Sequence, residues 1–353
     1  MHLCPAPVYT IAMPDTYSRD IAYCRYILPK VSRSFAFNIS LLRGQLHLSV
    51  LSGYLVCRIL DTIEDAPHFK SKTKITLLKS FLKIFNNYSE SGINTWTAKT
   101  AKLTAHPAEK ELLQNSSRVL RVIQKLPPFY KNELKGPVNR MGQGMAAMLR
   151  KHSKGHKATI KDENELKKYC YYVAGTVAEF LTGVFTQKIR SPYRRRYLKL
   201  YMNDFGLALQ LTNIIKDFQN DNQRNWGYIP RTWYQRFRLQ QKDFFCCRYP
   251  EKNKKLLSFF IKRIIDYQLK ALDYLKAIPR TRVRIRLFCA FALFLAAMTL
   301  RKISGQTHKK KIAHKVARSK VNKLIYTLPL IIFSNLLLER KLNKIINRIK
   351  ITY

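Results

Sequence analysis

Two short clusters of carboxylates, far apart in the chain, constrain its fold more than any other feature. Acidic residues are scarce, because 65 Lys and Arg stand against 21 Asp and Glu. Yet Asp61, Glu64 and Asp65 stand at i, i+3 and i+4, and Asp217 and Asp221 stand at i and i+4. Side chains at these spacings share one face of an α-helix. The spacing predicts two helices, each carrying a row of negative oxygens.

Each acidic row is expected to need a cation. Like charges at i and i+4 destabilise a helix. Ala66 and Pro67 follow the first row, so its helix should end there, at the negative end of the helix dipole, where carboxylates are unfavourable. Mg²⁺ prefers carboxylate oxygens and usually leaves ligand positions for substrate phosphates. Two such rows facing each other would form a magnesium site for a diphosphate.

The strongly basic composition is compatible with several kinds of anionic partner. The formal net charge is +44, and a basic surface attracts nucleic acid, anionic lipid headgroups or diphosphate substrates. Lys, Ile and Asn are frequent throughout the chain, so the excess of Lys could instead reflect a general composition bias that is unrelated to any partner. A basic helical protein could bind nucleic acid, but such a face should keep acidic residues away. The two acidic rows therefore argue against a nucleic-acid partner.

Cysteines and apolar stretches bear on location. The seven cysteines are irregularly spaced, which favours reduced cytosolic thiols and argues against a zinc site. Residues 1–20 lack a basic stretch followed by an apolar run, so no secretory signal is expected. The apolar stretches 287–300 and 324–338 fall short of the ~20 residues of a spanning helix and are interpreted as core helices. A cytoplasmic protein is expected, with peripheral attachment to the inner face of an anionic membrane left open.

Helix signals dominate, and they predict an all-α fold with a central cavity. Gly is rare, and no alternating strands with hairpin turns occur. Residues 1–20 are interpreted as an N-terminal segment and residues 21–345 as one domain, basic after about residue 305. Loops are predicted at 89–107, 150–161 and 226–230. Helices are predicted within 32–67 and at 72–88, 109–126, 131–149, 163–188, 197–222, 252–277 and 283–302, with further helix in the tail.

Polar side chains extend both acidic rows. Arg58 precedes Asp61 by three residues, and its guanidinium could grip a phosphate or form an internal Arg–Asp ion pair. Gln210 and Asn213 extend the second row as a polar stripe on an otherwise apolar helix. Such a stripe is costly if it is buried without partners. A wet, metal-bearing cavity would satisfy it.

These segments resemble the squalene/phytoene synthase family of head-to-head isoprenyl diphosphate synthases. The resemblance covers most of the chain, and its motifs follow the family's order. It implies the isoprenoid synthase fold and a Mg²⁺-dependent condensation of two prenyl diphosphates, so the protein would be a prenyltransferase. Lys216 stands where many members carry Arg, which keeps the charge but loses the bidentate geometry. The matching segments are residues 32–35, 58–65, 141–146, 169–177, 210–217 and 224–230.

The resemblance implies roles for individual residues. Both acidic rows would bind Mg²⁺, one on each side of the cavity. Tyr169 matches the family's tyrosine for a proton transfer and Tyr54 another active-site tyrosine, with a core or surface aromatic as the lesser alternative for Tyr169. The diphosphate would be held by Arg33, Arg58, Lys216, Gln210 and Asn213. A water-excluding lining would come from Phe35, Val173, Val177, Leu209 and Phe288, of which Phe288 could simply be core.

The resemblance also bears on the product. Hydride from NADPH would give squalene, whereas proton loss would give dehydrosqualene or, from longer substrates, phytoene. The sequence Asp-Thr-Ile-Glu-Asp at 61–65 and Met-Gly-Gln-Gly-Met-Ala at 141–146 resemble the squalene-forming members more than the phytoene-forming ones. Farnesyl diphosphate and NADPH are therefore the expected substrate and reductant. An inactive scaffold is disfavoured because the acidic rows are intact.

Overall fold

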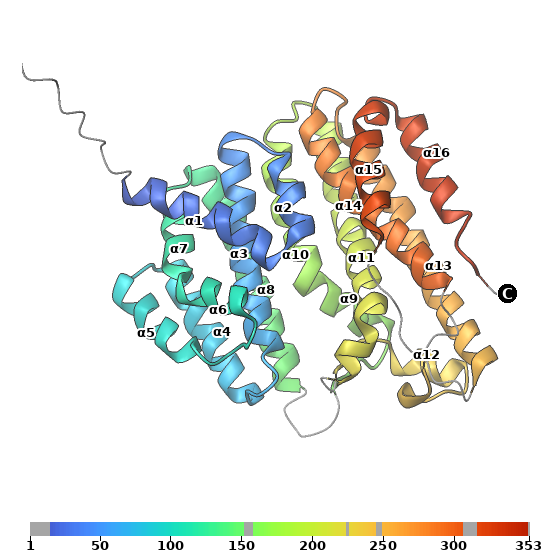
Figure 1. The fold of residues 1–353 in the computed structure, drawn as a ribbon, viewed down its shortest axis with the longest axis horizontal. Helices are drawn as coiled ribbons and strands as arrows, with labels where there is room; N and C mark the ends of the chain where they lie inside the picture. Colours follow the sequence, from blue (N-terminus) through green and yellow to red (C-terminus); the bar gives the residue numbers. More distant parts are fainter. Residues whose placement is uncertain (1–14, 152–157, 224–225, 245–248, 306–315, 352–353) are drawn as a thin grey trace, which may run out of the picture.

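The computed structural model describes residues 15–151, 158–223, 226–244, 249–305 and 316–351, and these are almost entirely helical (Figure 1). Besides the α-helices they include the π-helical turn η1 (Tyr171–Gly175), the 3₁₀ turn η2 (Gln241–Asp243), and the short strands β1 (Ala158–Thr159) and β2 (Trp226–Gly227), which pair in parallel. The all-α prediction is confirmed. The α-helices are α1 (Thr16–Val31), α2 (Arg33–Ser40), α3 (Gly44–Asp65), α4 (Ser71–Asn86), α5 (Glu90–Thr100), α6 (Pro107–Gln114), α7 (Ser116–Gln124), α8 (Pro128–Lys151), α9 (Glu163–Cys170), α10 (Thr176–Thr186), α11 (Pro192–Gln223), α12 (Arg231–Arg236), α13 (Pro250–Ala277), α14 (Val283–Ser304), α15 (Arg318–Ile331) and α16 (Asn335–Ile346).

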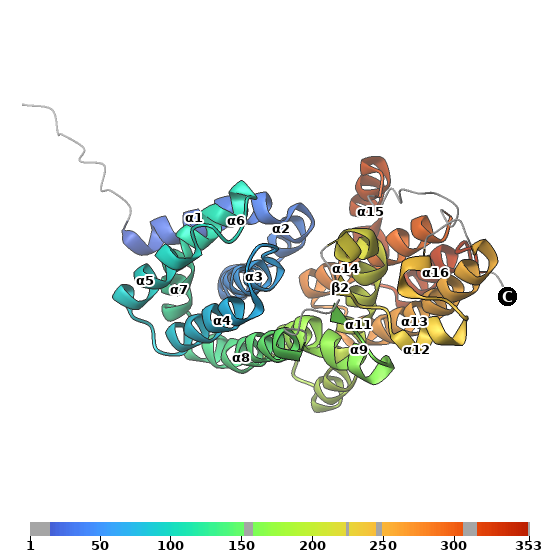
Figure 2. The same ribbon diagram turned by 90° about the horizontal axis from the view of Figure 1, so that it is seen from below.

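Two long helices, α3 and α11, each form the centre of one half of the molecule. Figure 2 shows α3 surrounded by α1, α4, α6, α7 and α8, with which it packs. Helix α11 packs against α13, α10, α14 and η1. A large apolar core extends through both halves, and a second cluster lies around α9, α11, α12 and α13. Both acidic rows therefore lie on helices that the core holds in place.

Two predictions in the N-terminal half are wrong. Residues 89–107 were predicted as a loop because they are polar, but most of them form α5. Ser89 caps this helix by accepting a hydrogen bond from Gly92 N at 3.2 Å. Its apolar anchors are Ile93 and Trp96, both fully or almost fully buried. The single helix predicted at 109–126 is two helices, α6 and α7, which meet at Asn115.

The predicted helix 163–188 is interrupted. The backbone N–H of Thr176 donates to the carbonyl of Tyr171, five residues earlier, and this bond defines the π-helical turn η1 between α9 and α10. Residues 226–230 begin with β2, where a loop was predicted. Residues 152–157 of the predicted loop at 150–161 lie outside the described ranges.

Among the residues that the structure describes, two helices, α3 and α14, are long and apolar enough by length and composition to cross a membrane. Within the protein, 61% of the apolar window of α3 and 67% of that of α14 are buried. The stretch 287–300 thus belongs to a 22-residue helix, and its burial agrees with the interpretation as core.

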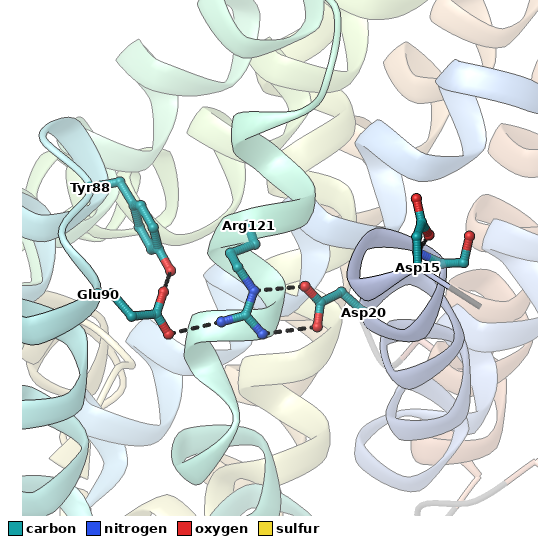
Figure 3. Close-up of polar contacts among 6 residues, drawn as sticks. Asp15, Asp20, Tyr88, Glu90 and Arg121 are labelled. Carbon is teal, nitrogen blue, oxygen red and sulfur yellow. Dashed lines mark hydrogen bonds and ion pairs between the residues drawn. The ribbon is translucent and has the colours of Figure 1, made fainter. Parts of the chain in front are cut away.

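Helix α1 is fastened to the core by a charged network (Figure 3). Arg121 on α7 donates from Nε to Asp20 Oδ2 at 2.7 Å and from Nη2 to Asp20 Oδ1 at 2.9 Å. It also donates from Nη1 to Glu90 Oε1 at 2.9 Å, and Tyr88 donates to the same carboxylate group. The side chain of Asp20 is only 3% exposed, so its charge depends on the bidentate guanidinium.

We expect Arg121→Met to lower the free energy of unfolding by about 2–3 kcal/mol, because removing one partner leaves a buried carboxylate without its counter-charge. Urea denaturation followed by circular dichroism measures this change. Lys30→Met is the matched control, since Lys30 pairs with Glu111 at the surface, where ion pairs contribute little. Equal losses from both variants would contradict this role for Arg121.

Candidate active site

The first acidic row occupies the last turns of α3, as predicted from the spacing. Glu64 is buried, Asp61 is partly buried and Asp65 is exposed. Burial raises the pKa of Asp61 to about 7; Arg58 opposes this shift, and the nearby charges of Asp65 and Glu109 add to it. The row thus contains a carboxylate whose ionised form is poorly stabilised by the protein alone.

The second acidic row lies at the end of α11. Asp217 is partly buried and Asp221 is buried. Lys216 Nζ lies 3.1 Å from Asp217 Oδ2 and donates to Asn213 Oδ1, also at 3.1 Å. Gln210 is partly buried one turn before Asn213. The polar stripe therefore has its own cation, which a bound phosphate could share.

A pair of stacked tyrosines lies near carboxylates of both rows. The rings of Tyr169 and Tyr228 are stacked with centroids 4.6 Å apart. Burial, and then the charges of Glu64 and Asp65 from α3 and of Asp221 from α11, raise the pKa of Tyr228 well above its ordinary value. Both acidic rows are therefore within electrostatic reach of one tyrosine. The pKa of Tyr169 is raised too, by burial first.

Tyr228 was not singled out from the sequence. It lies in the segment after the second acidic row, and the ring of Trp226 also stacks on it with centroids 5.7 Å apart. Its only local signal was its place within that segment. Pairing with Tyr169 depends on contact between α9 and the chain after α11, which periodicity cannot reveal.

The arginines expected to hold phosphate differ in their surroundings. Arg58 donates from Nη2 to Glu109 Oε1 of α6 at 2.5 Å, so its partner is an acid other than the Asp61 considered above. Glu109 also accepts from Thr104 Oγ1 at 2.9 Å. Arg33, the first residue of α2, is exposed. Arg58 is thus held by α6 next to the first row, whereas Arg33 is able to reorient.

The residues expected to line the cavity fall into two groups. The ring of Phe35 lies 4.9 Å from that of Tyr54, whose pKa is raised to about 12 by burial. Val173 on η1, Val177 on α10 and Leu209 on α11 are partly buried side chains packed against the core. Phe288 is 4% exposed and meets Phe185 edge to face, which places it in the core.

The residues present fit magnesium held jointly with a phosphate. Within the described ranges, no three His, Cys, Asp or Glu side chains gather closely enough to hold a metal ion alone. Mg²⁺, however, commonly binds through one or two carboxylates together with substrate phosphates and water. The partly buried Asp61, with its raised pKa, is a hard oxygen donor that a divalent cation would keep ionised.

The pKa of Asp61 predicts how the metal-free protein responds to pH. Because the folded-state pKa of about 7 exceeds the ordinary value of 3.8, the folded state keeps a proton that the unfolded chain loses. Stability should therefore fall as pH rises from about 4 to about 7 and stay lower above it. Asp61→Asn should reduce this slope. Thermal melts in a chelator, from pH 4 to pH 8, compare the two proteins; identical slopes would contradict the prediction.

The helical arrangement around α3 and α11, with an acidic row on each, defines the isoprenoid synthase fold. The sequence model of the squalene/phytoene synthase family matches residues 28–322, and the chain belongs to this family. It is 30% identical over 316 residues to squalene synthase ERG9 of Candida albicans, covering 86% of this chain and 66% of that protein. It is 28% identical over 287 residues to the human squalene synthase, covering 81% and 64%. The chain thus spans just under two thirds of these relatives.

Solved structures agree on the fold. TcSQS in complex with the ligand E5700 superposes with a TM-score of 0.75 at 24% identity, covering 93% of this chain and 96% of that one. A dehydrosqualene synthase superposes with a TM-score of 0.62 at 21% identity, covering 91% of this chain and 100% of that one.

Proposed function

We propose that this protein is a farnesyl-diphosphate farnesyltransferase, a squalene synthase that joins two farnesyl diphosphates head to head. The observation that supports the proposal most strongly is that carboxylates of both acidic rows lie within electrostatic reach of the buried Tyr228. Similarity to the squalene synthases of Candida albicans and human supports this substrate and product.

Both rows would hold Mg²⁺ on opposite sides of the substrate, with Asp61, Glu64 and Asp65 facing Asp217 and Asp221. The metal supplies electrostatic stabilisation of the departing diphosphate. Lys216, Arg33 and Arg58 would contact the diphosphate oxygens as negative charge builds on them, and Asn213 and Gln210 would hold metal-bound water or phosphate.

The apolar side chains would protect the allylic cation that forms when the diphosphate leaves. Val173, Val177 and Leu209 offer no nucleophile, and Phe35 with Tyr54 would cover the same space from α2 and α3. Water must be excluded, because it would quench the cation. The second farnesyl double bond would then attack the cation.

The tyrosine pair would receive the proton that leaves as the cyclopropane closes to presqualene diphosphate. A raised pKa keeps Tyr169 a neutral phenol. A proton next to a carbocation is acidic enough for a neutral phenol oxygen to accept it, and the stacked Tyr228 would lie next to the proton's onward route. Ionisation of presqualene diphosphate, rearrangement and hydride transfer from NADPH would complete the reaction.

The test is incubation of the purified protein with Mg²⁺ and farnesyl diphosphate, with and without NADPH. We expect diphosphate release and squalene when NADPH is present, identified by gas chromatography with mass spectrometry. Dehydrosqualene under both conditions, or phytoene from the longer geranylgeranyl diphosphate, would instead assign a non-reductive synthase. No diphosphate release from either substrate would refute the proposed activity.

A further inference from the structure

A basic pocket lies at the opposite end of α11 from the second acidic row. Its volume is about 360 Å³. Along α11 it is separated from Asp217 by about 35 Å, at 1.5 Å per residue from Arg194. It is therefore distinct from the candidate active site. The pocket is lined by Arg194, Lys276, Pro279, Arg280, Thr281 and Asn335.

The charge of this basic pocket is only partly neutralised. Lys276 pairs with Asp273 at 3.2 Å and with Glu339 at 3.4 Å. Arg194 donates to the carbonyl of Ala277 at 3.0 Å. Among the described residues, neither Arg194 nor Arg280 has a carboxylate within ion-pair distance. Two guanidinium groups thus supply a local positive charge.

A third guanidinium is buried next to the pocket. Arg286 is fully buried, and within the described part of the chain it donates only to neutral oxygens, including Asn335 Oδ1 at 2.8 Å and the carbonyls of Ile278 at 2.6 Å and Ile332 at 2.9 Å. Burial lowers its pKa to about 10, and repulsion from Arg280 and Arg194 adds to the shift. A buried cation without an acidic partner is costly, and an anion in the pocket would offset that cost.

An exposed apolar surface adjoins the pocket, and we call it the apolar edge. It follows α15 and the first turn of α16, beginning close to Asn335 of the pocket, and Figure 2 shows α15 projecting from the molecule. Tyr326 and Leu330 are spaced at i and i+4 on α15, which places them on one side of that helix, and Phe333 follows in the turn between α15 and α16. The edge comprises Tyr326, Leu330, Phe333, Leu336 and Leu337, which are between 42% and 78% exposed.

We propose that this end of the protein docks on an anionic membrane, with a lipid phosphate in the basic pocket and the apolar edge inserted beside it. A guanidinium pair donates parallel hydrogen bonds to phosphate oxygens. Aromatic and aliphatic side chains next to cations are the usual pattern of interfacial attachment. The proposal concerns a surface remote from the acidic rows, so it does not depend on the proposed activity.

The test is flotation of the full chain with vesicles of phosphatidylcholine alone or mixed with an equal part of phosphatidic acid. We expect binding to the mixed vesicles only. The double variant R194Q/R280Q should bind about tenfold more weakly than R195Q/R196Q, which removes the same charge from exposed arginines on the same helix. Phe333→Ser with Leu336→Ser should also weaken binding, whereas Leu200→Ser, exposed on α11, should not.

Three results would overturn the proposal. Equal losses from the two arginine pairs would mean diffuse electrostatic attraction without a pocket. Unchanged vesicle binding by the Phe333→Ser/Leu336→Ser variant would show that the apolar edge does not insert into the membrane. A thermal shift with glycerol 3-phosphate that R194Q/R280Q abolishes, without vesicle binding by the native chain, would make the pocket a site for a soluble phosphate. Diphosphate release from farnesyl diphosphate, measured on the same variants, reports the proposed activity separately.

Discussion

We expect replacement of Asp217 with Asn to lower the proposed turnover of farnesyl diphosphate by roughly two to three orders of magnitude while leaving the fold intact. Asn keeps the size of the side chain but removes the negative charge that would hold Mg²⁺ against the departing diphosphate. Lys216 would then lose its carboxylate partner at 3.1 Å without gaining a substitute for the metal. The measurement is steady-state diphosphate release at saturating Mg²⁺, with circular dichroism to check helicity.

Asp204→Asn is the matched control for this experiment. Asp204 lies on the same helix, but its partner is Lys270 of α13 at 3.4 Å, and it contributes to neither acidic row. Its replacement should leave turnover within a few fold of the native value. A fully active Asp217→Asn enzyme would refute the metal-binding role, and equal losses from both variants would indicate general damage to α11.

Replacing Tyr169 with Phe is expected to slow formation of the cyclopropyl intermediate by about a hundredfold, in line with losing a positioned proton acceptor. Phe preserves the ring stacked on Tyr228, so the change isolates the hydroxyl. Single-turnover analysis of presqualene diphosphate separates this step from binding, because substrate affinity should change little.

Tyr171→Phe is the control for the hydroxyl of Tyr169. Tyr171 lies two residues away, but its hydroxyl donates to Glu179 at 3.3 Å, near the Arg140–Glu179 ion pair. It should keep native rates. Normal rates for Tyr169→Phe would mean that another base, such as the released diphosphate, takes the proton.

The sequence predicted the elements that carry the acidic rows because their signals are local. The i, i+3, i+4 spacing and Pro67 placed the row on α3 and the end of that helix correctly. Helix α5 was missed although Ser89 and the buried pair Ile93 and Trp96 give it a cap and an apolar face. Its other residues are polar, and their number outweighed that signal.

The contacts that complete the candidate site come from packing between distant segments. Glu109 reaches Arg58 from another helix, and Tyr228 meets Tyr169 across the end of α11. No local sequence pattern at Glu109 or Tyr228 indicates which residue it will contact. The assignments of metal, phosphate and cavity residues stay predictions, which the variants above address.

The wide turn η1 sets the relative phase of two helices that are continuous along the chain. One extra residue in a turn rotates everything after it by about 100° relative to an unbroken α-helix. Gly206 of α11 approaches this turn so closely that a Cβ there would lie 3.0 Å from the carbonyl oxygen of Ala174. The side chains of Tyr169, before the turn, and Val177, after it, therefore point in directions that differ from those they would have on one unbroken α-helix. The five residues of η1 therefore act as an angular spacer within one continuous helical segment. They allow α9 to present a polar side chain and α10 to present apolar side chains in directions that an unbroken α-helix would not permit.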